Sequence, residues 1–244
     1  MVRGLSAVLG AYGLALAYLL VAPHIPAPAN PDAAALAAGA AGLVAYGLCA
    51  LVLVPAHDEA VPLALLALGS GLLAVMLAQT DARPGQDLFK VALTAAVGML
   101  LAHALRGAPA AVIGVPIFVA AVDAWSALSG PTSVLVREHP ATADALSFSL
   151  PAWRHGAGGA QLGVSDIVFM AFFAASAWRY GLRRILTAAL LVASLVATLA
   201  VGIAVDRTMP AVPGLALALL LPNLDRIPAV LRAEGAARTG PSPR

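Results

Sequence analysis

Long apolar runs, separated by short polar or proline-containing segments, follow one another along almost the whole chain. A bilayer core about 30 Å thick is crossed by roughly 20 apolar residues of helix, so runs of this length predict transmembrane helices. The runs predict helices over residues 4–22, 33–54, 61–80, 88–105, 108–128, 161–179, 184–205 and 209–222. The predicted fold class is therefore all-α, a polytopic membrane helical bundle with about eight transmembrane helices.

The composition agrees with a membrane protein. Hydrophobic residues make up 61% of the chain and charged residues only 11%, whereas a soluble domain carries about 25% charged residues. Most of the surface must therefore face lipid, so the bilayer itself is an expected partner. The net charge of +2 comes from arginines in loops and in the tail, which indicates membrane topology and not nucleic-acid binding. The single cysteine, Cys49, excludes an intrachain disulfide and a cysteine metal cluster.

The basic residues divide unequally between the two sides of the predicted bundle. The side that includes both termini holds nine of them, Arg3, Arg106, Arg179, Arg183, Arg184, Arg226, Arg232, Arg238 and Arg244. The opposite side holds five, Arg83, Lys90, Arg137, Arg154 and Arg207. The positive-inside rule then places both termini in the cytoplasm, and we expect a multi-pass protein of a prokaryotic plasma membrane.

Two aspartates interrupt the apolar runs. Asp123 lies near the end of the fifth predicted helix, in FVAAVDAWSAL, and Asp166 lies near the start of the sixth. A carboxylate at the bilayer centre costs about 2.5–3.5 kcal/mol even on lenient insertion scales, so acids within apolar spans indicate a function. Because consecutive spans run antiparallel, both carboxylates should lie at similar depth, about 8 Å inside the boundary on the side of loop 129–160.

A third polar feature is the segment RTMPAVPGLALALLLPNLDR, residues 207–226. Pro210 and Pro213 interrupt the start of any helix here, and the apolar stretch after them has only about 13 residues, near 20 Å of helix. If Asp225 and Arg226 lie at one interface, the Pro210 end begins inside the membrane, at the level of the two aspartates. Irregular backbone at that depth is tolerated only where it lines protein or a water-filled cavity. The sequence therefore predicts a polar cavity.

Two carboxylates in such a cavity tend to hold one proton between them, because both cannot ionise easily in a low dielectric. This is the arrangement of an aspartic protease, in which one carboxylate takes a proton from water while the protonated one polarises the scissile carbonyl. The irregular backbone beside them offers N–H and C=O groups with which an extended substrate can pair by strand addition.

In these residues the chain resembles the presenilin and signal-peptide-peptidase family of intramembrane aspartyl proteases. That family carries an aspartate in one span, usually after tyrosine, a Gly-x-Gly-Asp motif in the next, and Pro-Ala-Leu at the start of a later span. This chain has Val122-Asp123, then Gly163-Val164-Ser165-Asp166, then Pro210-Ala211-Val212-Pro213. The resemblance covers about residues 108 to 225, and the segment GPTSVLVRE after Asp123 is similar as well.

The resemblance implies a role for each matching residue. Asp123 and Asp166 would be catalytic, and the substrate would be contacted by Gly163, Ser165, Pro210, Ala211, Val212 and Pro213. The substrates would be proteins with transmembrane segments, and neither a metal nor another cofactor is implied. We accordingly divide the chain into N-terminal transmembrane helices (1–107), a presenilin-like catalytic core (108–231) and a polar C-terminal tail (232–244).

Three departures from the family pattern bear on this reading. Valine replaces the usual tyrosine before Asp123, Ser165 replaces a glycine, and Val212 replaces a leucine. Glycine beside a catalytic carboxylate allows close approach of backbone, whereas the hydroxyl of Ser165 could hydrogen-bond Asp166 and favour its ionised form. The substitution is compatible with activity.

Two other functions use the same residues. A proton- or cation-coupled transporter also places acids inside the membrane, although transporters often show two related halves and none are evident here. A catalytically inactive relative would bind membrane helices without cutting them. Prepilin peptidases, a further membrane aspartyl family, fit less well because they lack the late Pro-Ala-Leu element.

Overall fold

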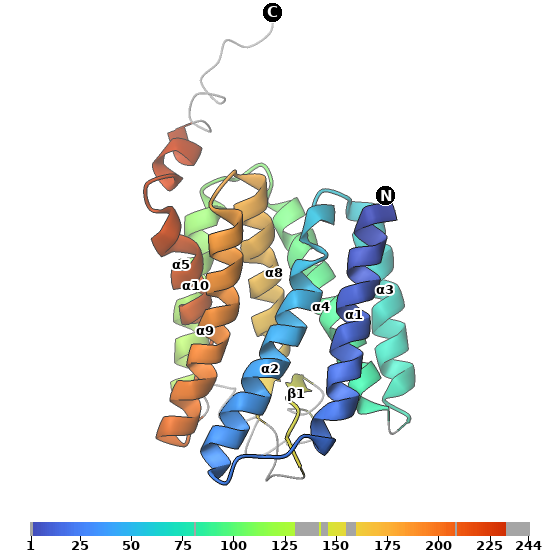
Figure 1. Ribbon diagram of the computed structural model, residues 1–244. Helices are drawn as coiled ribbons and strands as arrows, with labels where there is room; N and C mark the ends of the chain where they lie inside the picture. The colour runs from blue at the N-terminus through green and yellow to red at the C-terminus, as the bar shows by residue number, and fades with distance from the viewer. Residues whose placement is uncertain are drawn as a thin grey trace, which may run out of the picture.

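The computed structural model is a bundle of helices with a small two-stranded sheet at one end (Figure 1). It describes residues 2–80, 82–129, 142, 146–154, 160–207 and 209–232. The α-helices are α1 (Val2–Val21), α2 (Pro31–Leu51), α3 (Ala60–Leu77), α4 (Arg83–Ala104), α5 (Ala111–Ser129), α8 (Val164–Arg179), α9 (Arg184–Val205) and α10 (Val212–Leu220). The described ranges also contain the short 3-10 helices η1 (Ala22–His24), η2 (Val54–Ala56) and η3 (Leu221–Asn223).

The prediction of a helical fold is confirmed, and each predicted apolar run overlaps one of these helices. Within the described residues, five helical segments are long and apolar enough to cross a membrane, which suggests a membrane protein: Leu5–His24, Pro31–Ala56, Ala60–Leu77, Arg83–Ala104 and Arg184–Val205. Ala111–Ala127 and Val212–Asn223 are apolar but shorter. The start of α1 and the end of the described chain lie at the same end of the bundle (Figure 1).

A β-hairpin at the opposite end corrects the purely helical prediction. Strand β1 (Ser147–Ser149) pairs antiparallel with β2 (Gln161–Gly163), and Phe148 stands opposite Leu162. The helix predicted to start at residue 161 therefore starts at Val164, because the three residues before it pair with β1. Both Phe148 and Leu162 are buried, so the hairpin continues the apolar core.

Helix α4 also starts earlier than predicted, at Arg83 and not at residue 88. A proline in its first turn favours the helix start there. Asp87, in the extra turn, and Lys90, in the next turn, have partners in the hairpin, so they need not lie outside the bundle.

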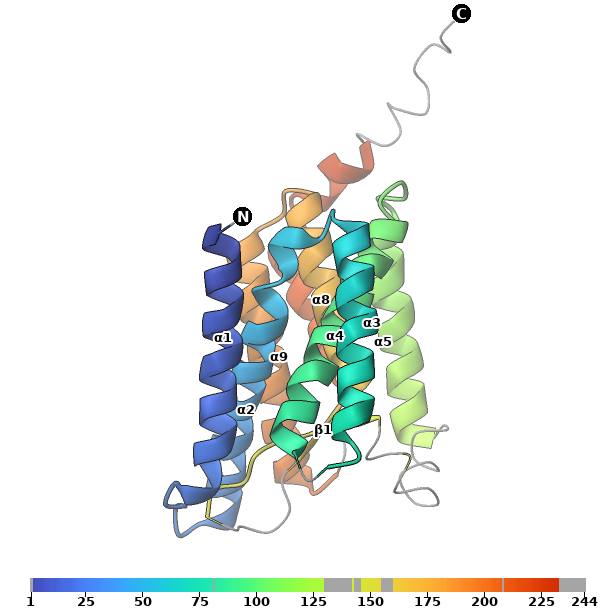
Figure 2. The ribbon, with the colours of Figure 1, turned by 90° about the vertical axis from the view of Figure 1, so that its right-hand side faces the viewer.

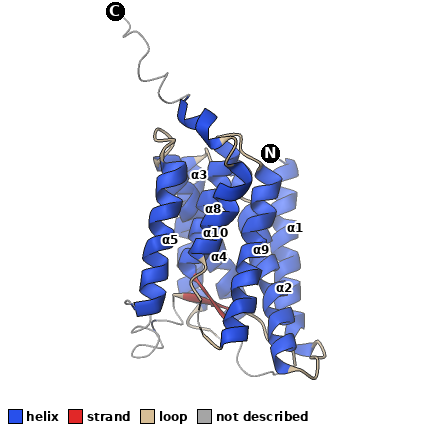
Figure 3. Ribbon diagram, turned by 90° about the vertical axis from the view of Figure 1, so that its left-hand side faces the viewer, coloured by secondary structure: helices blue, strands red, loops and turns tan. Residues whose placement is uncertain are grey.

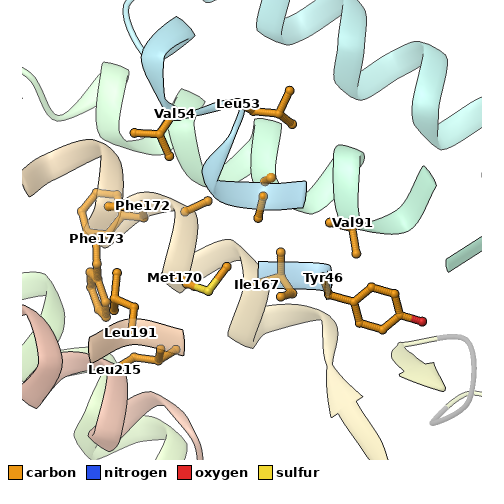
Figure 4. Packing of buried hydrophobic residues seen from close by; sticks show 14 of the residues in the cluster. Tyr46, Leu53, Val54, Val91, Ile167, Met170, Phe172, Phe173, Leu191 and Leu215 are labelled. Carbon is orange, nitrogen blue, oxygen red and sulfur yellow. The ribbon is translucent and has the colours of Figure 1, made fainter. Parts of the chain in front are cut away.

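Helix α8 lies at the centre of the bundle. Its apolar residues Ile167, Met170 and Phe173 are fully buried. Figure 4 shows Phe173 on the side of Leu191 and Leu215, and Ile167 on the opposite side. Helices α4 and α8 pack closely along each other, and α3 covers α4 from outside (Figure 2). Helix α8, which carries Asp166, is thus held on several sides.

Helix α10 is short and begins inside the bundle, as its sequence predicts. It has 9 residues and lies between α5 and α9 (Figure 3). A Cβ added to Gly214 would lie 3.4 Å from the Cβ of Ser194 and 3.6 Å from Oγ1 of Thr198. Because Thr198 lies two turns before the end of α9 at Val205, the start of α10 is set about 10 Å back from that end.

Candidate active site

Asp123 of α5 is bound to the start of α10. Its Oδ2 atom accepts a hydrogen bond of 3.0 Å from the backbone N–H of Val212, the first residue of α10. The first N–H groups of a helix have no partner within the helix, so a side-chain oxygen placed there satisfies one of them. The N-cap residue of α10 is Ala211, whose side chain makes no capping hydrogen bond. The contact joins the first and third sequence motifs directly.

Asp166 is the third residue of α8 and is 8% exposed. Its Oδ2 atom accepts a hydrogen bond of 3.1 Å from the backbone N–H of Gly163, the N-cap residue. An acid at this position that reaches back to the N-cap N–H is one half of a capping box. Asp166 therefore has a structural role in starting α8, whatever else it does.

The two carboxyl groups lie within electrostatic reach of each other. Each also accepts a backbone N–H at the start of a helix, Asp123 at α10 and Asp166 at α8. The positive ends of these two helices favour negative charge beside them, while the two carboxylates disfavour each other's charge. Mutual repulsion of this kind favours a pair that carries one proton in all.

Gly163 and Ser165 are close to Asp166 in the sequence, at the start of α8. A Cβ on Gly163 would lie 3.2 Å from Oδ2 of Asp166, so a larger residue would crowd the carboxylate. The backbone of Gly163 is extended, with φ −67° and ψ 144°, and close approach explains the glycine better than backbone conformation. Ser165 is exposed, and among the described residues its hydroxyl forms no hydrogen bond with Asp166.

The proline motif is partly helical. Pro210 and Ala211 precede α10, while Val212 and Pro213 form its first turn. The expectation that both prolines interrupt the helix is therefore wrong for Pro213, because proline is well tolerated in a first turn, where its missing N–H is not needed. Ala211 and Val212 are buried, and Pro210 is half-buried.

A cavity of about 480 Å³ opens beside Asp166. Its polar lining residues are Gln161, Asp166, Thr198, Asp206 and Arg207. Met209 and Ala211 line it as well, so the predicted polar cavity lies beside the irregular segment before α10. Asp166 lines this cavity, whereas Asp123 is not among its lining residues and is joined to the start of α10 by its hydrogen bond with Val212. Of the loop 129–160, residues 130–141, 143–145 and 155–159 lie outside the described residues.

Two polar residues of α4, Asp87 and Lys90, bind the hairpin strand β1. Oδ2 of Asp87 accepts the backbone N–H of Ser149 at 3.3 Å, and Nζ of Lys90 donates to the carbonyl of Ser147 at 3.1 Å. The two side chains are themselves 3.5 Å apart. Tyr46 of α2 donates to the carbonyl of Ser149. Since β1 pairs with β2, these contacts fix the strand that leads into Asp166.

Sequence reasoning missed this cluster. Lys90 is used above only as one of the basic residues that indicate membrane orientation. Asp87 is not among the predicted site residues, because it lies before the predicted start of its helix. The available signal was an acid and a lysine three residues apart, a spacing that places them on one helix face, at the edge of an apolar run. That spacing indicates a polar partner outside the helix.

We expect Asp87→Ala to lower the free energy of unfolding by about 3 kcal/mol, because it leaves Lys90 buried without a counter-ion. The side chain of Lys90 is 14% exposed. Asp87→Ala with Lys90→Met should recover most of the loss, since no unpaired charge remains. The matched control is Asp225→Ala, which breaks a pair with Arg183 whose side chains are 58% and 39% exposed and should cost less than about 1 kcal/mol. Thermal unfolding in detergent measures all three, and a double variant as unstable as Asp87→Ala would contradict the coupling.

Comparison with known proteins identifies no relative of the chain. No family model, no curated protein and no solved structure matches the chain. Function is therefore inferred from three helices that bring Asp123, Asp166 and the start of α10 together.

Proposed function

We propose that the protein is an intramembrane aspartyl endopeptidase of the presenilin type, which hydrolyses peptide bonds in transmembrane segments. The observation that supports this most is the hydrogen bond from the N–H of Val212 to Asp123, with Asp166 within electrostatic reach. Three motifs far apart in sequence thereby meet at one place, from α5, α8 and α10. An arbitrary set of buried polar residues has no reason to converge in this way.

In the proposed reaction the dyad begins with one proton. The ionised carboxylate takes a proton from water as the water oxygen bonds to the scissile carbonyl carbon, and the protonated carboxyl group donates to the carbonyl oxygen. The protonated carboxyl group then donates its proton to the peptide nitrogen while the other carboxylate takes a proton from a hydroxyl group of the tetrahedral intermediate, the C–N bond breaks, and a new carboxylic acid and a new amine leave. The dyad is again singly protonated, and no metal or cofactor takes part.

The cavity beside Asp166 is the proposed place for the substrate. A transmembrane helix must open locally before a peptide bond can reach the dyad, because helical carbonyls are already hydrogen-bonded. The strand β2 and the irregular segment before α10 lie next to the same cavity, so an extended substrate could pair with their backbone. Gly163 would then leave room for that substrate beside Asp166.

The proposal includes eight membrane crossings with both termini in the cytoplasm. The five long apolar helices would be joined by α5, α8 and the short α10, whose start lies within the bundle. Several arginines lie at the end of the bundle where α1 begins (Figure 1). Arg179 pairs with Asp58, Arg183 pairs with Asp225, and Arg226 donates to the carbonyl of Gly181. A basic end of this kind is expected on the cytoplasmic side, here of a prokaryotic plasma membrane.

A second candidate is a catalytically inactive protein of the same type. Both carboxylates accept a backbone N–H at the start of a helix, and this alone would explain their presence in apolar helices. In that case the cavity would bind an unwound membrane segment without cleaving it.

The test is cleavage of a labelled transmembrane peptide by the purified protein in lipid vesicles, with the products identified by mass spectrometry. The proposal expects cuts within the membrane-spanning part of the peptide, and it expects variants of either aspartate to be inactive. A wild-type protein that binds the peptide without cutting it would support the inactive relative.

We expect Ser165→Gly to keep or raise the rate of cleavage. The change removes bulk beside the carboxylate, and it breaks no hydrogen bond to Asp166 among the described residues. Glycine in the first turn costs about 1 kcal/mol of helix stability relative to alanine, which limits the gain. The rate is measured with the same peptide, with Ser165→Ala as the comparison. A loss of more than about tenfold in both variants would show that the hydroxyl takes part in the reaction.

A further inference from the structure

A second cavity, of about 450 Å³, lies on the side of the bundle between α2, α8 and α9. It shares no lining residue with the cavity beside Asp166. Its walls are apolar, formed by Val44 and Leu48 of α2, Ala174 of α8, and Ala188, Ala189 and Val192 of α9. The small alanines create the hollow between larger neighbours. We call this feature the α2–α9 groove.

One end of the α2–α9 groove carries a positive charge. Arg184, the first residue of α9, lines the groove, and its guanidinium lies 4.7 Å from the ring centroid of Trp178. In the described part of the chain no carboxylate pairs with Arg184. The neighbouring Arg179 and Arg183, in contrast, pair with Asp58 and Asp225. The guanidinium of Arg184 can therefore bind an anion from outside the chain.

The start of α9 adds to this charge. Its N-cap residue is Arg183, whose side chain does not cap the helix, and the first N–H groups of a helix carry partial positive charge. A guanidinium and a helix start at the same place form a site for an anion such as phosphate. The stacking on Trp178 holds the guanidinium there, and tryptophan is enriched at the membrane–water interface.

The groove below this charge has the shape of a chain-binding site. It extends along α9 from Arg184 to Val192, about 12 Å of helix. Ile185 beside it is 87% exposed, so the surrounding surface is one that lipid covers in a membrane. An acyl chain is present at high concentration there and fits an apolar hollow, whereas a free phosphate would leave the hollow empty.

We propose that the α2–α9 groove binds an anionic phospholipid, with its phosphate against Arg184 and the start of α9 and one acyl chain along Ala188 and Ala189. The lipid would brace α9 against α2 and the end of α8, the helix that carries Asp166. The proposal requires insertion into a membrane and is independent of the protease proposal.

The experiment is native mass spectrometry of the purified protein after exchange into an equal mixture of phosphatidylglycerol and phosphatidylcholine. The wild type should retain phosphatidylglycerol in preference to phosphatidylcholine. Arg184→Gln should lower the ratio of retained phosphatidylglycerol to phosphatidylcholine about fivefold, the effect of one basic residue near an anionic surface. Ala188→Phe should reduce retention of both lipids, because the ring fills the groove.

Two controls separate the site from general effects. Arg232→Gln removes an exposed basic residue at the same end of the bundle, outside the groove, and Ala197→Leu adds bulk to an exposed position of α9 beyond it. Neither should change retention. Equal retention of the two lipids by the wild type, or an equal loss in Arg232→Gln and Arg184→Gln, would overturn the proposal. Full retention in Ala188→Phe would show that the lipid binds elsewhere.

Discussion

Asp123→Asn and Asp166→Asn should each lower cleavage of a transmembrane peptide by roughly 10⁴-fold, the upper end of the range for a general acid–base group. The amide can neither take a proton from water nor give one to the leaving nitrogen, so each variant removes one half of the proposed proton transfer. The double variant should be little worse than either single variant, because members of one catalytic unit act together. Initial rates of peptide cleavage in vesicles measure all three.

Asparagine is the informative replacement because both aspartates also start helices. Its side-chain oxygen can still accept the N–H of Val212 or of Gly163, and asparagine is as good a helix cap as aspartate. The variants should therefore stay folded, as thermal unfolding in detergent would show. Asp58→Asn, at the other end of the bundle and 67% exposed, is the matched control and should cleave like the wild type. Substantial cleavage by either Asp123→Asn or Asp166→Asn would rule out the dyad.

The helices could be predicted because each depends on a local property, the length of an apolar run. The helix over 184–205 was predicted with the bounds that α9 has. The short α10 could be predicted from Pro210 and Pro213 and from the short apolar stretch after them. That stretch is too short to cross a bilayer, so its length alone predicted a start inside the bundle. The start of α8 was predicted at residue 161 but lies at Val164, and there a contact with a distant segment decides where the helix begins.

The hairpin is the clearest case of such a contact. Gln161–Gly163 precede an apolar run and could continue the helix of α8 toward its N-terminus, although Gly163 favours a helix end. They form a strand because Ser147–Ser149 lies alongside, held by Asp87, Lys90 and Tyr46 from two other helices. A single sequence does not reveal that pairing, because it joins segments of the chain that lie far apart. The same limit hid the bond between Val212 and Asp123, although both motifs had been recognised.

Gly98→Ala should be the most destabilising small substitution in the bundle. A Cβ at Gly98 of α4 would lie 2.2 Å from the backbone carbonyl oxygen of Val168 and 3.0 Å from the backbone nitrogen of Phe172, both in α8. Backbone atoms cannot swing aside as the end of a side chain can, so the two helices must move apart. Separation of α4 from α8 should cost about 3 kcal/mol, the upper end for overpacking.

The matched control is Gly69→Ala in α3, where an added Cβ would have no neighbour within 4 Å. There alanine should raise stability by up to about 1 kcal/mol, because it is the better helix former. Thermal unfolding in detergent should therefore move in opposite directions for the two variants. Gly98→Ala should also slow cleavage even where it remains folded, because α8 carries Asp166 two residues before Val168 and cannot shift without moving that carboxylate from Asp123. A Gly98→Ala protein as stable as the wild type would mean that α4 and α8 are not in backbone contact, and the position of Asp166 would then have to be assigned anew.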